Sequence, residues 1–236
     1  METVKVTGSI VPNSNKWIYD WLGIEATAPQ DVENAFAKAG GKGVTIWINS
    51  GGGDVGAGNE IAYIISKYKG VTIAEIAGYC CSAATLVSCA ADKVRMMPSA
   101  LYMIHNVSTC ASGDHQLFSH EATVLKTASE AIAEAYRRKT GKSMAELAAL
   151  MDSETWLNAR QAKEEGFVDE IIEVEKPATL VNGIGPMLSE ETIEKIRSQI
   201  KLSEEPEKGE KEAFLNAKKV AQINLELLRM KGEMNV

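Results

Sequence analysis

VTIWINSGGGDVGAGNEIAYIISKYKGVTIAEIAG, residues 44 to 78, contains the pattern that decides the fold. Residues 44–48 are rich in β-branched side chains, which is typical of a buried strand, and we expect this strand to end at residue 48. Isoleucines then recur at helical spacing within residues 55–70, and a glycine closes the segment. Residues 71–78 have the character of a second buried strand. A strand, a helix and a strand in this order predict a βαβ unit of a parallel sheet.

The alternation of strands and helices continues beyond this unit. We predict a helix at 82–91, strands at 93–98 and 100–106, a long helix at 114–139 and a further helix at 144–151. Ser143, followed three residues later by Glu146, forms a capping box at the start of the last of these helices. The predicted fold class is therefore α/β with a largely parallel sheet.

The composition changes after residue 175. Residues 176–212 contain glycine, proline and the charged run LSEEPEKGEKE, which we expect to act as a flexible linker. Residues 213–236 predict an amphipathic helix, whose apolar stripe consists of Phe214, Ala217, Ala221, Leu225 and Leu228. This helix either docks on the parent domain or a neighbouring subunit, or serves as a mobile or partner-binding tail. We therefore expect a core domain at 1–175, an extension and charged linker at 176–212, and a C-terminal helix at 213–236.

Length and composition exclude several classes of protein. A chain of 236 residues with 45% hydrophobic and 24% charged residues is long enough for one substantial core. A net charge of -7 argues against nucleic-acid binding, which needs clustered basic residues. No apolar run approaches the roughly 20 residues that cross a bilayer, and the N-terminus has no secretory pattern, so we expect a cytoplasmic protein without membrane contact.

The four cysteines predict neither disulfides nor metal binding. Cys80, Cys81, Cys89 and Cys110 lack the CxxC spacing of metal sites and have no histidine pattern beside them. In a reducing cytoplasm they would remain thiols. We therefore expect no metal ion and no cofactor.

Two polar residues follow predicted strands at the same edge of the sheet. Ser82 lies between a buried strand and a helix, where the helix N-terminus stabilises negative charge; it could equally be a plain N-cap serine. His105 ends the next apolar strand, at the edge where sites of parallel sheets are found. His115 and His120 fall on the long polar helix, where we expect them to be solvated. Ser82 and His105 are therefore our candidate nucleophile and base.

Two further groups complete the candidate site. The glycines after the strand at 44–48 allow backbone N–H groups to point at one anion, although a tight turn explains them equally well. A carboxylate would hold the imidazole in the right tautomer, and Asp152 and Glu154 are the attractive candidates. Each of these acids could also be a surface acid or a helix cap.

Five ordered segments, INSGGGDVGAG, AGYCCSAA, MIHN, TGKS and ETWLNARQAKEEGFVDE, carry a resemblance over roughly residues 3–173. The chain resembles the ClpP family of serine peptidases, and more closely its phage and prophage branch of head maturation proteases. The resemblance implies a spiral of βαβ units shared with crotonases, a protruding handle helix from about residue 114, and homo-oligomeric rings, usually heptameric.

The resemblance also implies roles for individual residues. Ser82 takes the place of the nucleophile and His105 that of the base, while Gly53 and the backbone N–H of Ala83 take the place of the oxyanion hole. An ungapped match puts Glu154 at the triad acid, with Asp152 as the alternative. Three departures accompany these matches: the proline usual before the glycines is Gly51, the glutamate Glu154 replaces the triad aspartate, and two alanines before the nucleophile are Cys80 and Cys81. We expect these cysteines to pack beneath the Ser82 turn.

The function implied is a serine endopeptidase that cleaves peptides or proteins through an acyl-enzyme. In the phage branch its partner is a capsid or scaffold protein, and the alternative is a cellular ClpP-like subunit fed by an AAA+ ATPase. Three other hypotheses remain: a crotonase-like acyl-CoA enzyme, a non-catalytic ring subunit, and a cysteine peptidase that uses Cys81.

Overall fold

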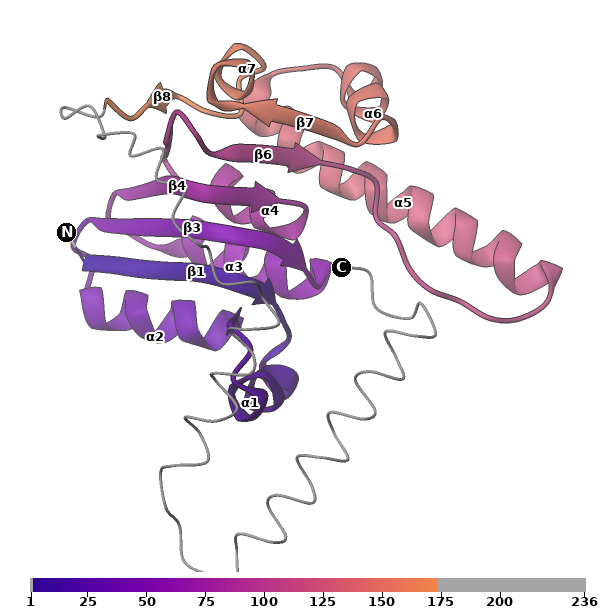
Figure 1. Ribbon diagram of the computed structural model, residues 1–236, viewed down its shortest axis with the longest axis horizontal. Coiled ribbons are helices and arrows are strands. Elements are labelled where there is room, and N and C mark those ends of the chain that lie inside the picture. The colour runs from indigo at the N-terminus through magenta and orange to yellow at the C-terminus, as the bar shows by residue number, and fades with distance from the viewer. Residues whose placement is uncertain (1, 174–236) are drawn as a thin grey trace, which may run out of the picture. The chain divides into compact units, whose positions relative to one another are not determined.

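The computed structural model describes residues 2–173, which contain one eight-stranded sheet and seven helices (Figure 1). The strands are β1 (Glu2–Ile10), β2 (Ala26–Thr27), β3 (Val44–Gly53), β4 (Thr72–Cys81), β5 (Lys93–Met96), β6 (Leu101–Ile104), β7 (Thr155–Asn158) and β8 (Glu170–Ile171). The helices are α1 (Asn13–Leu22), α2 (Pro29–Ala39), α3 (Val55–Lys67), α4 (Ala83–Cys89), α5 (His115–Thr140), α6 (Met144–Asp152) and α7 (Ala159–Glu164). The predicted extension, linker and C-terminal helix lie outside the described residues.

The sheet is parallel except at one edge. Six strands follow the order β2-β1-β3-β4-β5-β8, and every pair among them is parallel. β4 has two neighbours on the same side, because its residues 73–76 pair with β5 and its residues 79–81 pair with β6. β7 runs antiparallel to β6, as Figure 1 shows. The predicted α/β class is confirmed, and the antiparallel β7 is an addition to it.

Alternation along β3 explains how the sheet meets its core. Val44, Ile46 and Ile48 are fully buried, whereas the residues between them are partly exposed. Successive side chains of a strand point to opposite faces, so the buried set packs against one layer of helices. Figure 1 shows α3 and α4 behind the strands, and the apolar residues of both helices join the same core cluster. The predicted βαβ unit is therefore present as β3, α3 and β4.

The prediction that the first strand ends at residue 48 is wrong. β3 continues to Gly53, with Ser9 of β1 beside Gly52 and Ile10 beside Gly53, after a shift of register. Gly52 has a φ of 96° and Gly53 a φ of 143°, conformations that favour glycine. The glycines therefore extend the strand in an irregular form instead of ending it as a turn.

Four elements precede residue 44, where our sequence analysis assigned none. β1 alternates buried Val4 and Val6 with exposed residues, in the manner of a half-buried strand. α2 begins at Pro29, a residue favoured in the first helical turn, and buries Val32 and Phe36. These elements extend the sheet beyond β3 and cover its edge.

The two predicted C-terminal helices of the core are confirmed. Asp114 caps α5 through its Oδ1, which accepts hydrogen bonds from the N–H groups of Gln116 and Leu117 at 3.1 and 3.0 Å. Ser143 and Glu146 form the predicted capping box of α6. Only the second half of α5 is packed against the core, and the first half projects beyond the strands (Figure 1). Within residues 2–173, no helix is both long enough and apolar enough to span a membrane.

Candidate active site

Ser82 lies at a strained junction between β4 and α4. Its φ of 54° and ψ of -126° belong to a region that L residues rarely adopt. Apart from glycines, Ser82 and Glu154 alone have a positive φ in the part of the chain that the structure describes. Strain of this kind costs about 1–3 kcal/mol and persists where the surroundings determine it, often at functional sites. Ser82 occupies the N-cap position of α4, but its side chain makes no capping hydrogen bond, so it is not a plain N-cap serine.

The hydroxyl of Ser82 is hydrogen-bonded to His105 instead. Cys81 of β4 pairs with Met103 of β6, and the Ser82 N–H donates to the Met103 carbonyl at 3.0 Å. This pairing brings the end of β4 beside the residue that follows β6. The distance between Ser82 Oγ and His105 Nε2 is 2.8 Å, and both residues are half-buried. The structure therefore brings together the two residues that the sequence predicted as a pair.

A buried hydroxyl pair supports the Ser82 turn from below. Thr85 Oγ1 donates to the Ser82 carbonyl at 2.5 Å and lies 2.6 Å from the hydroxyl of Tyr136. A threonine hydroxyl has a single hydrogen, which Ser82 receives, so Tyr136 must be the donor to Thr85. Thr85 and Tyr136 are both fully or almost fully buried. Tyr136 is thus a contact from α5 to the nucleophile turn that the helical pattern of the sequence did not reveal.

The adjacent cysteines pack beneath the same turn, as predicted. Cys80 and Cys81 are free thiols, both buried, and Cys80 Sγ lies 3.4 Å from the Ala84 carbonyl. Burial raises the pKa of the Cys81 thiol from 9.0 to about 11, and it also raises the pKa of Cys80. The thiolate is the nucleophilic form of cysteine, so little of it would exist near neutral pH. These observations count against the cysteine peptidase hypothesis.

The glycines at the end of β3 contact the Ser82 turn closely. A Cβ on Gly52 would lie 2.6 Å from the Cys81 carbonyl oxygen and 2.7 Å from Ser82 Cβ. A Cβ on Gly53 would lie 2.3 Å from the Ile10 carbonyl oxygen. Only glycine therefore fits at either position. Ala83 is the first residue of α4, so its N–H has no acceptor within the helix. Gly52 therefore holds the end of β3 against the Ser82 turn, while the following Gly53 lies against Ile10 of β1.

The pairing of β6 with β7 distinguishes the two candidate acids. Ile104 lies opposite Thr155 in this antiparallel ladder. The ladder ends with this pair; His105 directly follows β6 and Glu154 directly precedes β7, so each is one residue from the last pair. Asp152 lies two residues further from the ladder, at the end of α6. The register thus favours Glu154, a signal that was absent from the sequence because β7 was not predicted.

Neither carboxylate is hydrogen-bonded to His105 within residues 2–173. Glu154 Oε1 accepts from the indole Nε1 of Trp156 at 3.2 Å. Asp152, the last residue of α6, accepts from Asn106 Nδ2 at 2.7 Å through its Oδ1. Asn106 and Trp156 are neighbours of the site that sequence reasoning missed. Both candidate acids are exposed, so among the described residues the hydrogen-bonded part of the site is the pair of Ser82 and His105.

The other predicted site features have simpler outcomes. His115 and His120 lie on α5 and are exposed, as expected. Among the described residues, no group of histidine, cysteine and acidic side chains is arranged to hold a metal ion.

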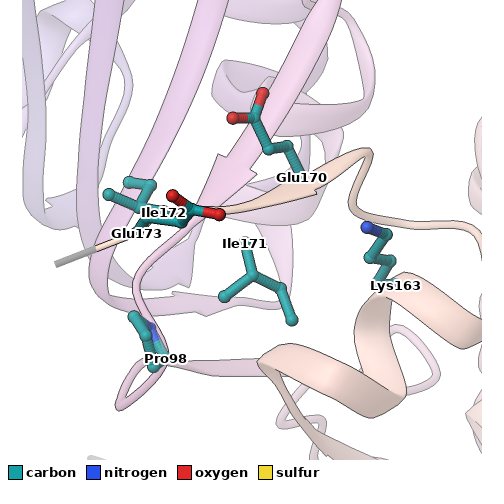
Figure 2. A pocket seen from close by; sticks show the side chains of 6 residues that line it. All are labelled: Pro98, Lys163, Glu170, Ile171, Ile172 and Glu173. Atoms are coloured by element: carbon teal, nitrogen blue, oxygen red, sulfur yellow. The ribbon is translucent and has the colours of Figure 1, made fainter. Parts of the chain in front are cut away.

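A hollow of about 690 Å³ lies apart from Ser82 and His105. It is lined by Pro98, Lys163, Glu170, Ile171, Ile172 and Glu173 (Figure 2). A hydrogen bond from Lys93 lowers the pKa of Glu170, so this carboxylate is neutralised by an ion pair. None of the lining residues is a serine, a cysteine or a histidine, and we assign the hollow no chemistry.

Comparison with known proteins agrees with this geometry. The sequence model described as Clp protease matches residues 35–175, more than half of the chain. The ATP-dependent Clp protease proteolytic subunit 1 of Corynebacterium jeikeium (strain K411) is 31% identical over 132 residues, which are 55% of this chain and 70% of the relative. The corresponding subunit of Chlorella vulgaris is 26% identical over 137 residues, 57% of this chain and 68% of the relative.

A solved structure shares the fold. A point mutant of ClpP1 from Listeria monocytogenes superposes with a TM-score of 0.60 and 27% sequence identity, over 74% of this chain and 92% of that one. The family match and the fold agree with each other, and this chain belongs to the Clp protease family.

Proposed function

We propose that the chain is a serine endopeptidase of the ClpP type. His105 Nε2 accepts the proton of Ser82 as Oγ attacks a peptide carbonyl, which forms an acyl-enzyme that water then hydrolyses. The observation that carries this proposal is the 2.8 Å hydrogen bond between Ser82 Oγ and His105 Nε2 at a strained strand–helix junction. A hydroxyl held against an imidazole is the arrangement that general-base activation of serine requires.

The backbone N–H groups of Gly53 and Ala83 are our proposed oxyanion hole. The close contact of Gly52 with Ser82 holds the end of β3 against the start of α4, which supports this assignment. Donors that are fixed before the reaction stabilise the developing charge without reorganisation, and each contributes about 100- to 1000-fold in rate.

Glu154 is our proposed third member, ahead of Asp152. Its position directly before β7, beside the end of the ladder that His105 follows, supports this choice. In this role the Glu154 carboxylate accepts from the Nδ1–H of His105, which fixes the tautomer that leaves Nε2 free to accept a proton.

The substrate and its delivery follow from the resemblance. We propose that the chain forms a homo-oligomeric ring and processes a capsid or scaffold protein, with delivery by an AAA+ ATPase as the alternative. Incubation with a purified unfolded protein, with and without an AAA+ unfoldase and ATP, distinguishes the two. Cleavage that needs no ATP favours the processing protease, and strict dependence on the unfoldase favours the cellular alternative.

Labelling with a fluorophosphonate, followed by intact-mass spectrometry, tests the proposed chemistry. We expect one adduct on the full chain, mapping to Ser82, that is lost in both Ser82→Ala and His105→Ala. Cys81→Ala is the matched control and should retain the adduct. An assembled oligomer that takes up no adduct would contradict the proposal and favour the crotonase-like or non-catalytic hypothesis.

A further inference from the structure

One hydrogen bond beside the site has no part in the mechanism above. The indole Nε1 of Trp156 donates to Glu154 Oε1 at 3.2 Å. We propose that Trp156 is a positioning residue, which holds one oxygen of the Glu154 carboxylate so that the other is directed to His105. The inference rests on the proposed function, because it assigns Trp156 a purpose only if Glu154 is the acid.

Strand pairing brings these three residues to one end of the β6–β7 ladder. Trp156 lies opposite Met103, and the last pair of the ladder is Ile104 with Thr155. His105 directly follows β6, and Glu154 directly precedes β7. The hydrogen bond from Trp156 to Glu154 therefore lies at the end of the ladder where His105 is bound to the Ser82 hydroxyl.

Glu154 needs a support of this kind because little else holds it. Its side chain is exposed, and a glutamate loses about 1.5–2 kcal/mol of rotamer entropy when it is fixed in one conformation. In the part of the chain that the structure describes, Trp156 is the single hydrogen-bond partner of this carboxylate. The backbone of Glu154 is also strained, with a φ of 44°. An exposed acid at a strained position is consistent with a functional requirement and not with a stabilising one.

The chemistry of the indole suits the task. Tryptophan Nε1–H is a donor only, so it can bind the carboxylate but cannot take a proton from it. Its ring is rigid and 46% exposed, and only two side-chain torsions position it. Because Oε1 is engaged by Trp156, Oε2 remains for the Nδ1–H of His105.

The test measures the inactivation rate constant kinact and the affinity constant KI of the fluorophosphonate. Trp156→Phe keeps an aromatic ring and removes the N–H donor. We expect it to lower kinact about three- to tenfold, which corresponds to the net contribution of one ordinary hydrogen bond, with KI unchanged. Trp17→Phe is the matched control, since Trp17 is 65% exposed on α1, and its kinact should equal that of the wild type.

A double-mutant cycle separates positioning from a structural role. If Trp156 acts through the carboxylate, Trp156→Phe should have no further effect in a Glu154→Ala background. An equal loss in both backgrounds, a higher KI, or no loss in either background would each overturn the inference while leaving the labelled Ser82 in place. Absence of labelling in the wild type would overturn the proposed function, and the inference with it.

The hydrogen bond can also be observed without activity. In the full-length Ser82→Ala protein, the indole N–H resonance of Trp156 is identified by its loss in Trp156→Phe. We expect this resonance to move upfield when Glu154→Ala is added, because a bond to a carboxylate is lost. An unchanged resonance would overturn the inference.

Discussion

Two turns carry the proposed site, and they are held in different ways. The nucleophile turn, residues 81–83, and the acid turn, residues 152–154, contain the two non-glycine residues with a positive φ in the described part of the chain. Ser82 is braced by Gly52 on one side and by the buried Thr85 and Tyr136 on the other. Glu154 is held by its contact with Trp156 and by the closure of the turn, where its N–H donates to the Met151 carbonyl at 3.1 Å.

This difference indicates which half of the site is rigid. Interior packing has little free volume, so the nucleophile turn cannot shift without disturbing the core. Exposed hydrogen bonds contribute less and compete with water, so the acid turn can rearrange at small cost. We therefore expect changes in the nucleophile turn to affect stability and activity together, and changes in the acid turn to affect activity more than stability.

We expect the largest effect from a substitution that disrupts the nucleophile turn. Gly52→Ala would place a Cβ 2.6 Å from the Cys81 carbonyl oxygen, at a φ of 96°. The backbone must move, so we expect fluorophosphonate labelling to fall more than about 100-fold, together with a loss of about 2–4 kcal/mol in the free energy of unfolding. Gly51→Ala is the matched control, because nothing lies within 4 Å of its Cβ. Equal behaviour of the two variants would contradict the proposed bracing.

The next effect separates activity from stability in the acid turn. Removing the carboxylate in Glu154→Ala should lower the labelling rate about 100-fold or more, since triad acids contribute at least this much. Asp152→Ala should lower it less than about fivefold, because we expect it to loosen only the bond to Asn106. Labelling kinetics measure both changes, and the reverse order would assign the acid role to Asp152.

Glycine at the same position sharpens the comparison. Glu154→Gly should be about 1 kcal/mol more stable than Glu154→Ala, because glycine adopts a positive φ without strain. Chemical denaturation measures this difference. If both variants have the same stability, strain in the acid turn is not stored in the φ of Glu154.

Substitutions of the buried hydroxyl residues Thr85 and Tyr136 should have a smaller effect. Thr85→Val removes the donor to the Ser82 carbonyl and leaves the hydroxyl of Tyr136 buried without its acceptor. We expect a loss of about 1–3 kcal/mol in unfolding free energy, and about 1 kcal/mol for Tyr136→Phe, which leaves the bond from Thr85 to Ser82 intact. Thermal or denaturant unfolding of both variants checks the order, which would be reversed if Tyr136 had a second essential partner.

The smallest effect concerns the cysteines at high pH. Burial raises the pKa of Cys81 and Cys89 from 9.0 to about 11. The unfolded chain therefore loses these protons first, so stability is fully present below pH 9 and falls as the pH rises from about 9 to 11. Cys81→Ala should flatten this decline in denaturant melts between pH 8 and 11. In the native protein at pH 8, the exposed Cys110 should react with iodoacetamide well before Cys81.

Much of the rigid half of the site could be predicted from local patterns. The βαβ pattern fixes parallel strands, and parallel strands end at one edge, so Ser82 and His105 were expected to meet. Their hydrogen bond is present. Glycines after a strand signalled a close approach of backbones, although they extend β3 instead of ending it.

The identity of the acid could not be predicted from local patterns, because it depends on pairing between segments about fifty residues apart. No local pattern specifies the register of β6 with β7, and a shift by one residue would move every side chain to the opposite face. The structure pairs Ile104 with Thr155, which places Glu154 directly beside the end of the ladder and favours it over Asp152.

The sequence by itself therefore determined the α/β class, the order of the central elements and the serine–histidine pair, because these depend on periodicity and on the direction of parallel strands. Only the tertiary structure showed that β7 pairs with β6, that Tyr136 of α5 supports the nucleophile turn, and that Trp156 binds Glu154. Those contacts join residues whose proximity is set by packing and by strand register, and both depend on the whole fold.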